Sequence, residues 1–172
     1  MSVISEDYRA LNAQHHLEAQ EWGLQSIKHW RTVKAFCEDA GIDAVLDYGC
    51  GKRALERALA PFGIRVTNYD PAFPELAAPP KPQALVVCTD VLEHVEPECL
   101  DSVLKDLRRC TKLMAYFVIA TRASLRNMPD GTNPHRIVES KDWWLEKLDP
   151  YFKIHSHGPV GEKEFHLFVL PK

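Results

Sequence analysis

The chain has 172 residues, of which 45% are hydrophobic and 26% are charged. This length and composition suit one soluble globular domain with a sizeable core, and they exclude a fibrous or intrinsically disordered protein. The formal net charge of −3 gives no basic surface of the kind that binds long nucleic acids, so we expect no such partner.

The hydropathy of the chain bears on its location in the cell. No apolar stretch approaches the roughly 18 residues needed to span a bilayer. Residues 1–9 are polar and acidic, unlike a secretory signal, in which positive charges precede an apolar run. We therefore expect a cytoplasmic protein that does not bind membranes.

The cysteines are scattered along the chain, at Cys37, Cys50, Cys88, Cys99 and Cys110. No Cys-x-x-Cys pair occurs, so the sequence does not predict a structural zinc site. In a reducing compartment such cysteines act most simply as small core residues, and we predict that role here.

The first predicted elements are helices within residues 6–40. Apolar residues recur at helical spacing in the second half of this stretch, at Ile27, Trp30, Val33 and Cys37, and Gly41 stands where a helix would end. Trp22 and Gly23 mark a break between two helices. This pattern predicts a helical segment ahead of the first strand.

A buried strand is predicted at residues 44–48, followed by a helix over about 52–60 and a second strand at 64–69. The next stretch, residues 70–82, contains five prolines and cannot form a regular element. Two strands separated by one helix indicate a strand–helix–strand unit.

The middle of the chain repeats this order. A Val-rich run at residues 84–89 predicts a central strand, and a helix follows over 97–110 with Pro97 in its first turn. A further buried strand is predicted at residues 113–121. Residues 124–136 carry turn signals and are predicted to form a loop.

The last elements are a short helix and a pair of strands. Ser140 is the candidate N-cap of a helix over residues 140–148. Residues 152–157 and 164–170 flank a Gly-Pro-Val-Gly stretch, which predicts an antiparallel pair.

This element order predicts an α/β fold with a mainly parallel sheet and helices on both faces. Ligands of such sheets bind beyond the carboxyl ends of the strands. Asp47, Gly49, Asp70 and Asp90 all fall at predicted carboxyl ends. We therefore expect a binding site at this edge.

The residues at these strand ends resemble those of class I S-adenosylmethionine-dependent methyltransferases that act on small molecules. The resemblance lies in Val-Leu-Asp-Tyr-Gly-Cys-Gly at residues 45–51, in Asp70, and in the Asp-x-Leu-Glu-His signature at residues 90–94. The closing strand at 165–170 is similar to part of the family's C-terminal hairpin. The resemblance covers residues 44–172 and implies a Rossmann-like fold, with residues 1–43 as a helical lid and residues 44–172 as the methyltransferase domain.

Two features depart from the family pattern. Arg53 stands where the family usually carries a third glycine, so it could narrow the pocket or add a contact. The Pro-rich residues 70–82 leave hardly any room for the usual helix, third strand and adenine-capping loop. The sequence thus predicts a fold that is shortened around the usual third strand.

The resemblance implies roles for the residues of the glycine loop and the second strand. Gly49 and Gly51 would bring the backbone close to the methionine part of the cofactor, because glycine lacks a Cβ atom. Asp47 would attract the cofactor's ammonium group directly or through water. Asp70 would accept two ribose hydroxyls, which suits a carboxylate with two acceptor oxygens. The structural alternative is that both aspartates only cap turns.

Three further residues are assigned to the cofactor. Asp90, at the end of the third apolar run, is placed near the sulfonium, although it also suits a plain helix cap. Glu93, in the same signature, is assigned to the cofactor as well. Trp22 would shield the methyl group from a lid over the site, or it is a core residue at a helix junction.

Two histidines are candidate general bases. His94 would accept a proton from the substrate, since imidazole titrates near neutral pH. His135 lies in the loop that faces the methyl acceptor in this family. The alternatives are a structural hydrogen-bonding role for His94 and simple solvation for His135.

No metal site is predicted from the sequence. His155 and His157 share a strand face, and His166 lies on the expected partner strand. No carboxylate or cysteine completes a ligand set there.

The predicted function is transfer of a methyl group from S-adenosyl-L-methionine to an oxygen or nitrogen of a small molecule. One alternative is a non-catalytic protein that binds the same cofactor. A second is an NAD-dependent oxidoreductase, because Gly49-x-Gly51-x-x-Ala54 formally fits a dinucleotide motif with Asp70 at the ribose distance. The identity of the acceptor and the oligomeric state do not follow from the sequence.

Overall fold

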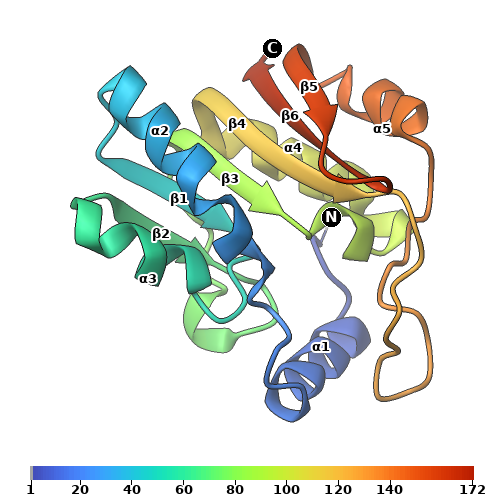
Figure 1. Ribbon diagram of the computed structural model, residues 1–172. Helices are drawn as coiled ribbons and strands as arrows, with labels where there is room; N and C mark the ends of the chain where they lie inside the picture. The colour runs from blue at the N-terminus through green and yellow to red at the C-terminus, as the bar shows by residue number, and fades with distance from the viewer. Residues whose placement is uncertain (1) are drawn as a thin grey trace.

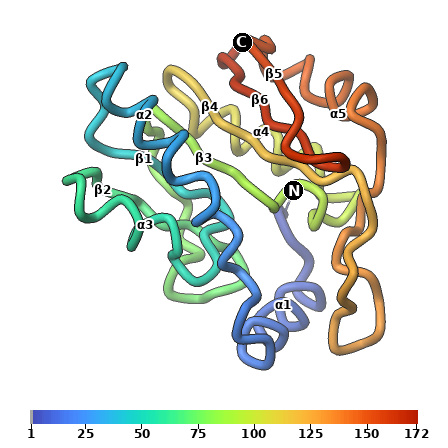
Figure 2. The backbone as a smooth tube through the Cα atoms, viewed as in Figure 1, coloured from blue at the N-terminus to red at the C-terminus, as the bar shows by residue number. Residues whose placement is uncertain are grey.

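The computed structural model describes residues 2–172 and contains one six-stranded sheet. Its strand order is β2-β1-β3-β4-β6-β5, and Figures 1 and 2 show the sheet as the centre of the molecule. The first four strands pair in parallel, whereas β6 runs antiparallel to both β4 and β5. The strands are β1 (Ala44–Tyr48), β2 (Arg65–Tyr69), β3 (Gln83–Thr89), β4 (Thr111–Ala120), β5 (Phe152–Pro159) and β6 (Glu164–Pro171).

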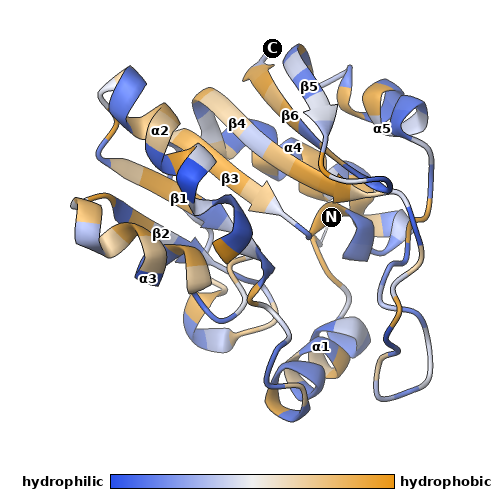
Figure 3. Cartoon of the chain, in the orientation of Figure 1, coloured by the Kyte–Doolittle hydropathy of each residue, from blue (hydrophilic) through white to orange (hydrophobic). Residues whose placement is uncertain are grey.

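Helices cover both faces of the sheet. The α-helices are α1 (Glu6–Glu18), α2 (Trp30–Ala40), α3 (Ala54–Leu59), α4 (Leu100–Cys110) and α5 (Lys141–Leu148). Side chains of α2 and α3 pack with one face of the sheet, and those of α4 and α5 pack with the other. Figure 3 shows the apolar strands enclosed by helices whose outer faces are polar. The predicted α/β fold with a closing antiparallel pair is confirmed.

Alternate residues of the central strands serve the two faces, as the two-residue period of a strand requires. In β1, Val45 belongs to the cluster with α2 and α3, whereas Leu46 belongs to the cluster with α4 and α5. In β3, Val87 belongs to the cluster with α2 and α3, and Val86 belongs to the cluster with α4 and α5. Because both faces are covered, these strands are apolar on both sides.

The connection from β2 to β3 is short, as predicted. It contains only a 3₁₀ turn at Pro74–Leu76, and the described residues form no strand between β2 and β3. The parallel part of the sheet therefore ends at β2. The shortening predicted from the prolines is confirmed.

The N-terminal part of the chain, from residue 2 onwards, contains three helical segments instead of the two that were predicted. Helix α1 ends at Glu18, a turn follows, and a 3₁₀ helix at Gln25–His29 leads into α2. Ile27 was expected to share the apolar stripe of this segment, but 46% of its surface is exposed because it lies in the 3₁₀ helix. Gly41 ends α2 in the left-handed conformation, as expected.

Two smaller predictions, the cap of α5 and the buried cysteines, are confirmed. Ser140 caps α5 by accepting a hydrogen bond from the backbone N–H of Trp143. All five cysteines are buried free thiols. Within residues 2–172, no helix combines the length and the apolar character that a membrane crossing requires.

Candidate functional site

A tight loop between β1 and α3 forms the centre of the site. The backbone N–H groups of Gly49 and Cys50 donate to the carbonyl oxygen of Tyr69, over 2.8 and 3.1 Å, and so join the ends of β1 and β2. Gly49 has a φ of 80°, and a Cβ added there would lie 2.4 Å from Cγ2 of Val91. This position therefore needs glycine for its backbone conformation and for its close packing.

Asp70 fastens the same loop to the end of β2. Its Oδ2 accepts the N–H of Gly51 over 2.9 Å, and its Oδ1 accepts the N–H of Ala72 over 3.0 Å. Burial raises the pKa of this carboxyl, while the two backbone donors act in the opposite direction. A carboxylate oxygen can accept more than one hydrogen bond, so Asp70 retains acceptor capacity for a ligand.

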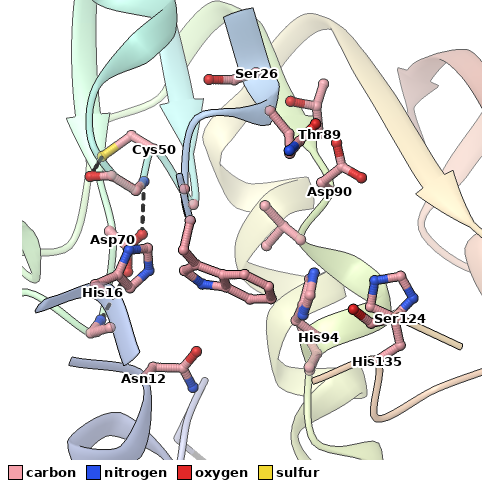
Figure 4. Close-up of a pocket in the computed structure, with 18 of the residues that line it drawn as sticks. Asn12, His16, Ser26, Cys50, Asp70, Thr89, Asp90, His94, Ser124 and His135 are labelled. Atoms are coloured by element: carbon pink, nitrogen blue, oxygen red, sulfur yellow. Dashed lines mark hydrogen bonds between the residues drawn. The ribbon is translucent and has the colours of Figure 1, made fainter. Parts of the chain in front are cut away.

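A cavity of about 390 Å³ opens beside this loop, at the carboxyl ends of the strands. Figure 4 shows its walls, with the glycine loop and Asp70 on one side and two histidines on the other. Seven of the residues singled out in the sequence line it: Trp22, Gly49, Gly51, Asp70, Asp90, His94 and His135. The structure therefore gathers the predicted site residues from five separate segments of the chain.

Two predicted cofactor residues do not line the cavity. Asp47 is 1% exposed and Glu93 is fully buried. Burial, together with the charges of Asp70 and Glu56, raises the pKa of Asp47 to about 7. Burial and the charge of Asp90 raise the pKa of Glu93 to about 8. The two carboxyl groups lie behind the cavity wall, so their positions do not support direct contact with a cofactor.

The buried Asp47 predicts an unusual dependence of stability on pH. Its pKa is higher in the folded protein than in the unfolded chain, so folding disfavours the ionised form. The penalty is absent below about pH 4, grows between pH 4 and 7, and reaches up to roughly 4 kcal/mol above pH 7. We expect Asp47→Asn to raise the melting temperature more at pH 8 than at pH 5, as thermal denaturation will show. An equal gain at both pH values would contradict this account.

Asp90 occupies a strained turn at the end of β3. Its φ of 53° lies in the left-handed region, which is uncommon for residues other than glycine. Burial, followed by the charge of Glu164, raises the pKa of its carboxyl to about 6. The neighbouring Thr89 contributes a buried hydroxyl that has no hydrogen-bond partner among the described residues. This corner therefore offers oxygen acceptors to a ligand.

Three aromatic side chains meet on the opposite wall. The rings of His94 and His135 are 4.7 Å apart and nearly perpendicular, and the Trp22 ring lies 5.3 Å from His94. Burial, followed by the nearby His135, lowers the pKa of His94 to about 3, and burial also lowers the pKa of His135. Both imidazoles are therefore neutral at physiological pH.

The N-terminal segment is fastened to the glycine loop. The N–H of Lys52 donates to the carbonyl oxygen of Gly23 over 3.0 Å, and its Nζ donates to the carbonyl oxygen of Ala19 over 2.7 Å. A Cβ added at Gly51 would lie 2.8 Å from the Cα and the carbonyl oxygen of Gly23. This contact between two glycines places Trp22 at the cavity.

Helix α1 supplies cavity residues that sequence reasoning missed. Tyr8, Asn12 and His16 all line the cavity. His16 also packs on Phe73, with ring centroids 4.8 Å apart. The three residues are spaced four apart, so they share one helix face. A polar and aromatic stripe at that spacing was a signal that could have identified them.

Comparisons with known proteins agree with this geometry. The profile of a family described as "Methyltransferase domain" matches residues 9–158. No curated protein matches the chain. Similar solved structures are found, and their low sequence identity means that they bear on the fold alone.

One such structure is the 1,6-didemethyltoxoflavin-N1-methyltransferase of Burkholderia thailandensis, with a TM-score of 0.68 and 15% identity, covering 96% of this chain and 89% of that one. Another is the DhpI–SAH complex, with a TM-score of 0.66 and 17% identity, covering 95% of this chain and 96% of that one. A third is magnesium protoporphyrin IX methyltransferase of Synechocystis PCC 6803 with bound SAH. Its TM-score is 0.60 and its identity 17%, and the match covers 86% of this chain and 83% of that one.

The family match spans most of the chain, and the fold and the loop between β1 and α3 agree with it. The chain therefore belongs to the methyltransferase domain family and is a class I S-adenosylmethionine-dependent methyltransferase.

Proposed function

We propose that this protein transfers a methyl group from S-adenosylmethionine to an oxygen or nitrogen of a small molecule held in the cavity. One observation carries the proposal: a single cavity joins the glycine loop and Asp70 to the pair His94 and His135. Two proteins of similar fold are named for methylation of small molecules, 1,6-didemethyltoxoflavin and magnesium protoporphyrin IX.

The residues present fit the cofactor. Gly49 and Gly51 let the loop pack closely on Val91 and Gly23, and both glycines line the cavity. Asp70 presents carboxylate oxygens that can accept ribose hydroxyls, and Asp90 adds a second carboxyl to the same cavity. Acidic groups favour a cation, so this wall suits the charged sulfonium and ammonium groups. When bound, the cofactor supplies an electrophilic methyl group.

The chain's own contribution is alignment and exclusion of water. Methyl transfer requires the acceptor atom to be held in line with the methyl group at near-contact distance. His94 and His135 lie opposite the glycine loop (Figure 4), and the Trp22 ring reaches His94, so we assign the three rings to the acceptor side. Trp22 covers apolar surface there and keeps water from the reacting groups.

We also propose that the N-terminal part acts as a lid. The sequence suggested residues 1–43 for this role, and residue 1 lies outside the described residues. Val33 and Cys37 of α2 are buried with the sheet, so α2 belongs to the main body. The 3₁₀ helix at Gln25–His29 also belongs to the main body, because its His29 is buried against Tyr116 of β4. The lid is accordingly residues 2–24, which carry the cavity side chains of α1 together with Trp22.

The proposal is tested by transfer of a labelled methyl group. The purified protein is incubated with methyl-labelled S-adenosylmethionine and a panel of small hydroxyl, phenol, amine and carboxylic acid compounds. We expect at least one acceptor to gain label, and the Asp70→Ala protein to transfer none. Binding of the cofactor without transfer to any acceptor would favour the non-catalytic alternative.

Arg53 does not narrow the pocket, contrary to the possibility raised by the sequence. Its side chain is exposed, and it does not line the cavity. Its φ of 57° is left-handed, which costs a residue with a Cβ about 1–2 kcal/mol. We expect Arg53→Gly to raise stability by about 1 kcal/mol at most, because glycine also gains entropy in the unfolded chain. Affinity for S-adenosylhomocysteine, measured by calorimetry, should stay within a factor of two, and a large gain would place Arg53 at the site.

A further inference from the structure

Three potential metal ligands meet beside the cavity: His94 and His135 line it, and the buried Glu93 lies directly behind its wall. Glu93 and His94 belong to the 3₁₀ turn at Leu92–His94, and His135 comes from the loop after β4. One ligand atom from each of them lies within 4.8 Å of the other two. Figure 4 shows the His94 and His135 rings next to each other. The sequence did not predict this set, because His135 lies far from the other two along the chain.

Backbone carbonyls fix the orientation of both imidazoles. Nδ1 of His94 lies 3.0 Å from the carbonyl oxygen of Pro134, and Nδ1 of His135 lies 2.6 Å from that of Arg122. A carbonyl oxygen only accepts, so each Nδ1 carries the hydrogen and each Nε2 carries a lone pair. Metal-binding histidines are usually held in this way, with the second nitrogen donating to a carbonyl or carboxylate.

Only one of the two carboxyl oxygens of Glu93 has a hydrogen-bond partner among the described residues. Its Oε1 accepts the N–H of Ala120 over 3.0 Å. Its Oε2 is buried and has no partner among the described residues. A buried carboxylate oxygen without a partner is costly, so this oxygen indicates that something else binds there. One carboxyl oxygen of Glu93 lies within 4.8 Å of a ring nitrogen of each histidine, and this combination of groups suits a cation.

The backbone around the three ligands is firmly held. The carbonyl oxygen of Glu93 accepts the N–H of Ile137 over 3.0 Å, which fastens the loop after β4 to the 3₁₀ turn. Asn133 accepts the N–H of His135 through its Oδ1, over 2.9 Å. Bonds of about 2.0–2.2 Å place three ligand atoms of one trigonal or tetrahedral cation roughly 3.4–3.8 Å apart. The three ligand atoms lie within 4.8 Å of one another, so each side chain moves by about 1 Å to complete the site.

We propose that Glu93, His94 and His135 bind one divalent transition-metal cation in the cavity wall, on the acceptor side. Two imidazoles and one carboxylate are a ligand set that such cations accept, and three protein ligands leave a position open for substrate. This inference rests on the proposed function only for the cation's role. It also replaces the general-base role suggested for the two histidines by a ligand role.

The site would select an acceptor that carries a hydroxyl group. A divalent cation favours the deprotonated form of an oxygen beside it, which makes that oxygen a stronger nucleophile. The acceptor O–H bond breaks and its proton passes to solvent. The new C–O bond then forms as the C–S bond of the sulfonium breaks, leaving a neutral thioether. The proposal therefore narrows the acceptor from oxygen or nitrogen to oxygen.

Metal binding is tested without any enzymatic assay. Chelator-treated protein is titrated with Co²⁺ while visible absorption is recorded, and Zn²⁺ is added afterwards as a competitor. We expect saturable binding of one Co²⁺ per chain and its displacement by Zn²⁺. His135→Ala, a change in a loop, should weaken Co²⁺ binding at least 100-fold. A wild-type protein that binds neither Co²⁺ nor Zn²⁺ would overturn the proposal.

Two controls make the result specific. The double variant His155→Ala/His157→Ala removes exposed histidines of β5 and should bind Co²⁺ as the wild type does. Titration of each variant with S-adenosylhomocysteine in the absence of metal reports whether the fold and the cofactor site are intact. Cofactor binding without metal binding would refute the metal site alone, whereas metal binding without cofactor binding would refute the proposed function alone. Co²⁺ binding by a folded His135→Ala protein at wild-type affinity would also overturn the proposal.

Discussion

Replacement of Asp70 by alanine is expected to weaken binding of S-adenosylhomocysteine at least 100-fold. The carboxylate lines the cavity and is the proposed acceptor of two ribose hydroxyls. Each hydrogen bond to a charged group contributes about 1.5–3 kcal/mol, so the loss of two accounts for this factor. The same substitution frees the N–H of Gly51, so the glycine loop also loses the bond that fastens it to the end of β2. Isothermal titration calorimetry measures the effect.

Asp43→Ala is the matched control for this substitution. Asp43 also lies beside a strand, but it is exposed and paired only with the exposed Arg65. Its removal should leave affinity unchanged, because an exposed ion pair contributes little. Wild-type affinity in a folded Asp70→Ala protein would show that the ribose is held elsewhere.

Gly51→Ala is expected to lower the free energy of unfolding by about 2–4 kcal/mol and to weaken cofactor binding at least tenfold. Two effects combine at this position. A residue with a Cβ is strained at a φ of 48°. The added Cβ also meets the backbone of Gly23 at 2.8 Å, and backbone atoms cannot move aside as a flexible side chain would. The substitution should therefore push residues 2–24 away from the glycine loop.

Gly63→Ala separates the two effects. Gly63 has a φ of 71°, but nothing lies within 4 Å of a Cβ added there. This control carries the backbone strain without the collision, so it should cost about 1 kcal/mol and leave affinity unchanged. Thermal denaturation measures stability, and limited proteolysis reports release of the N-terminal segment. Equal effects of the two substitutions would contradict the role of the contact between Gly51 and Gly23.

The sheet and its binding edge could be predicted from the sequence because both depend on local patterns. Apolar runs defined the strands, and parallel strands bring their carboxyl ends to one edge. That reasoning was enough to bring Gly49, Asp70 and Asp90 together without any knowledge of the tertiary structure. The prolines after Asp70 likewise predicted the shortened connection to β3.

The direction of individual side chains was predicted less well. Asp47 was assigned to the cofactor by its place at a strand end, yet the two-residue period of β1 puts it on the face of Val45, beneath α2 and α3. The charge of Glu56 in α3 acts on it there. Counting alternate residues along β1 would have predicted a buried carboxyl at this position.

The acceptor wall depends on contacts between distant segments. Trp22 reaches the cavity only because Gly23 packs on Gly51, and His135 reaches His94 only through the path of a long loop. No local pattern encodes either approach. The sequence could therefore nominate these residues one by one but could not predict that they form one wall.

The central claim is that this cavity binds S-adenosylmethionine, and calorimetric titration of the wild-type protein tests it most directly. S-adenosylmethionine, S-adenosylhomocysteine and NAD are titrated separately into the same preparation. We expect micromolar binding of the first two and no heat of binding with NAD. Binding of NAD, or no binding of either S-adenosyl compound by the folded protein, would contradict the account.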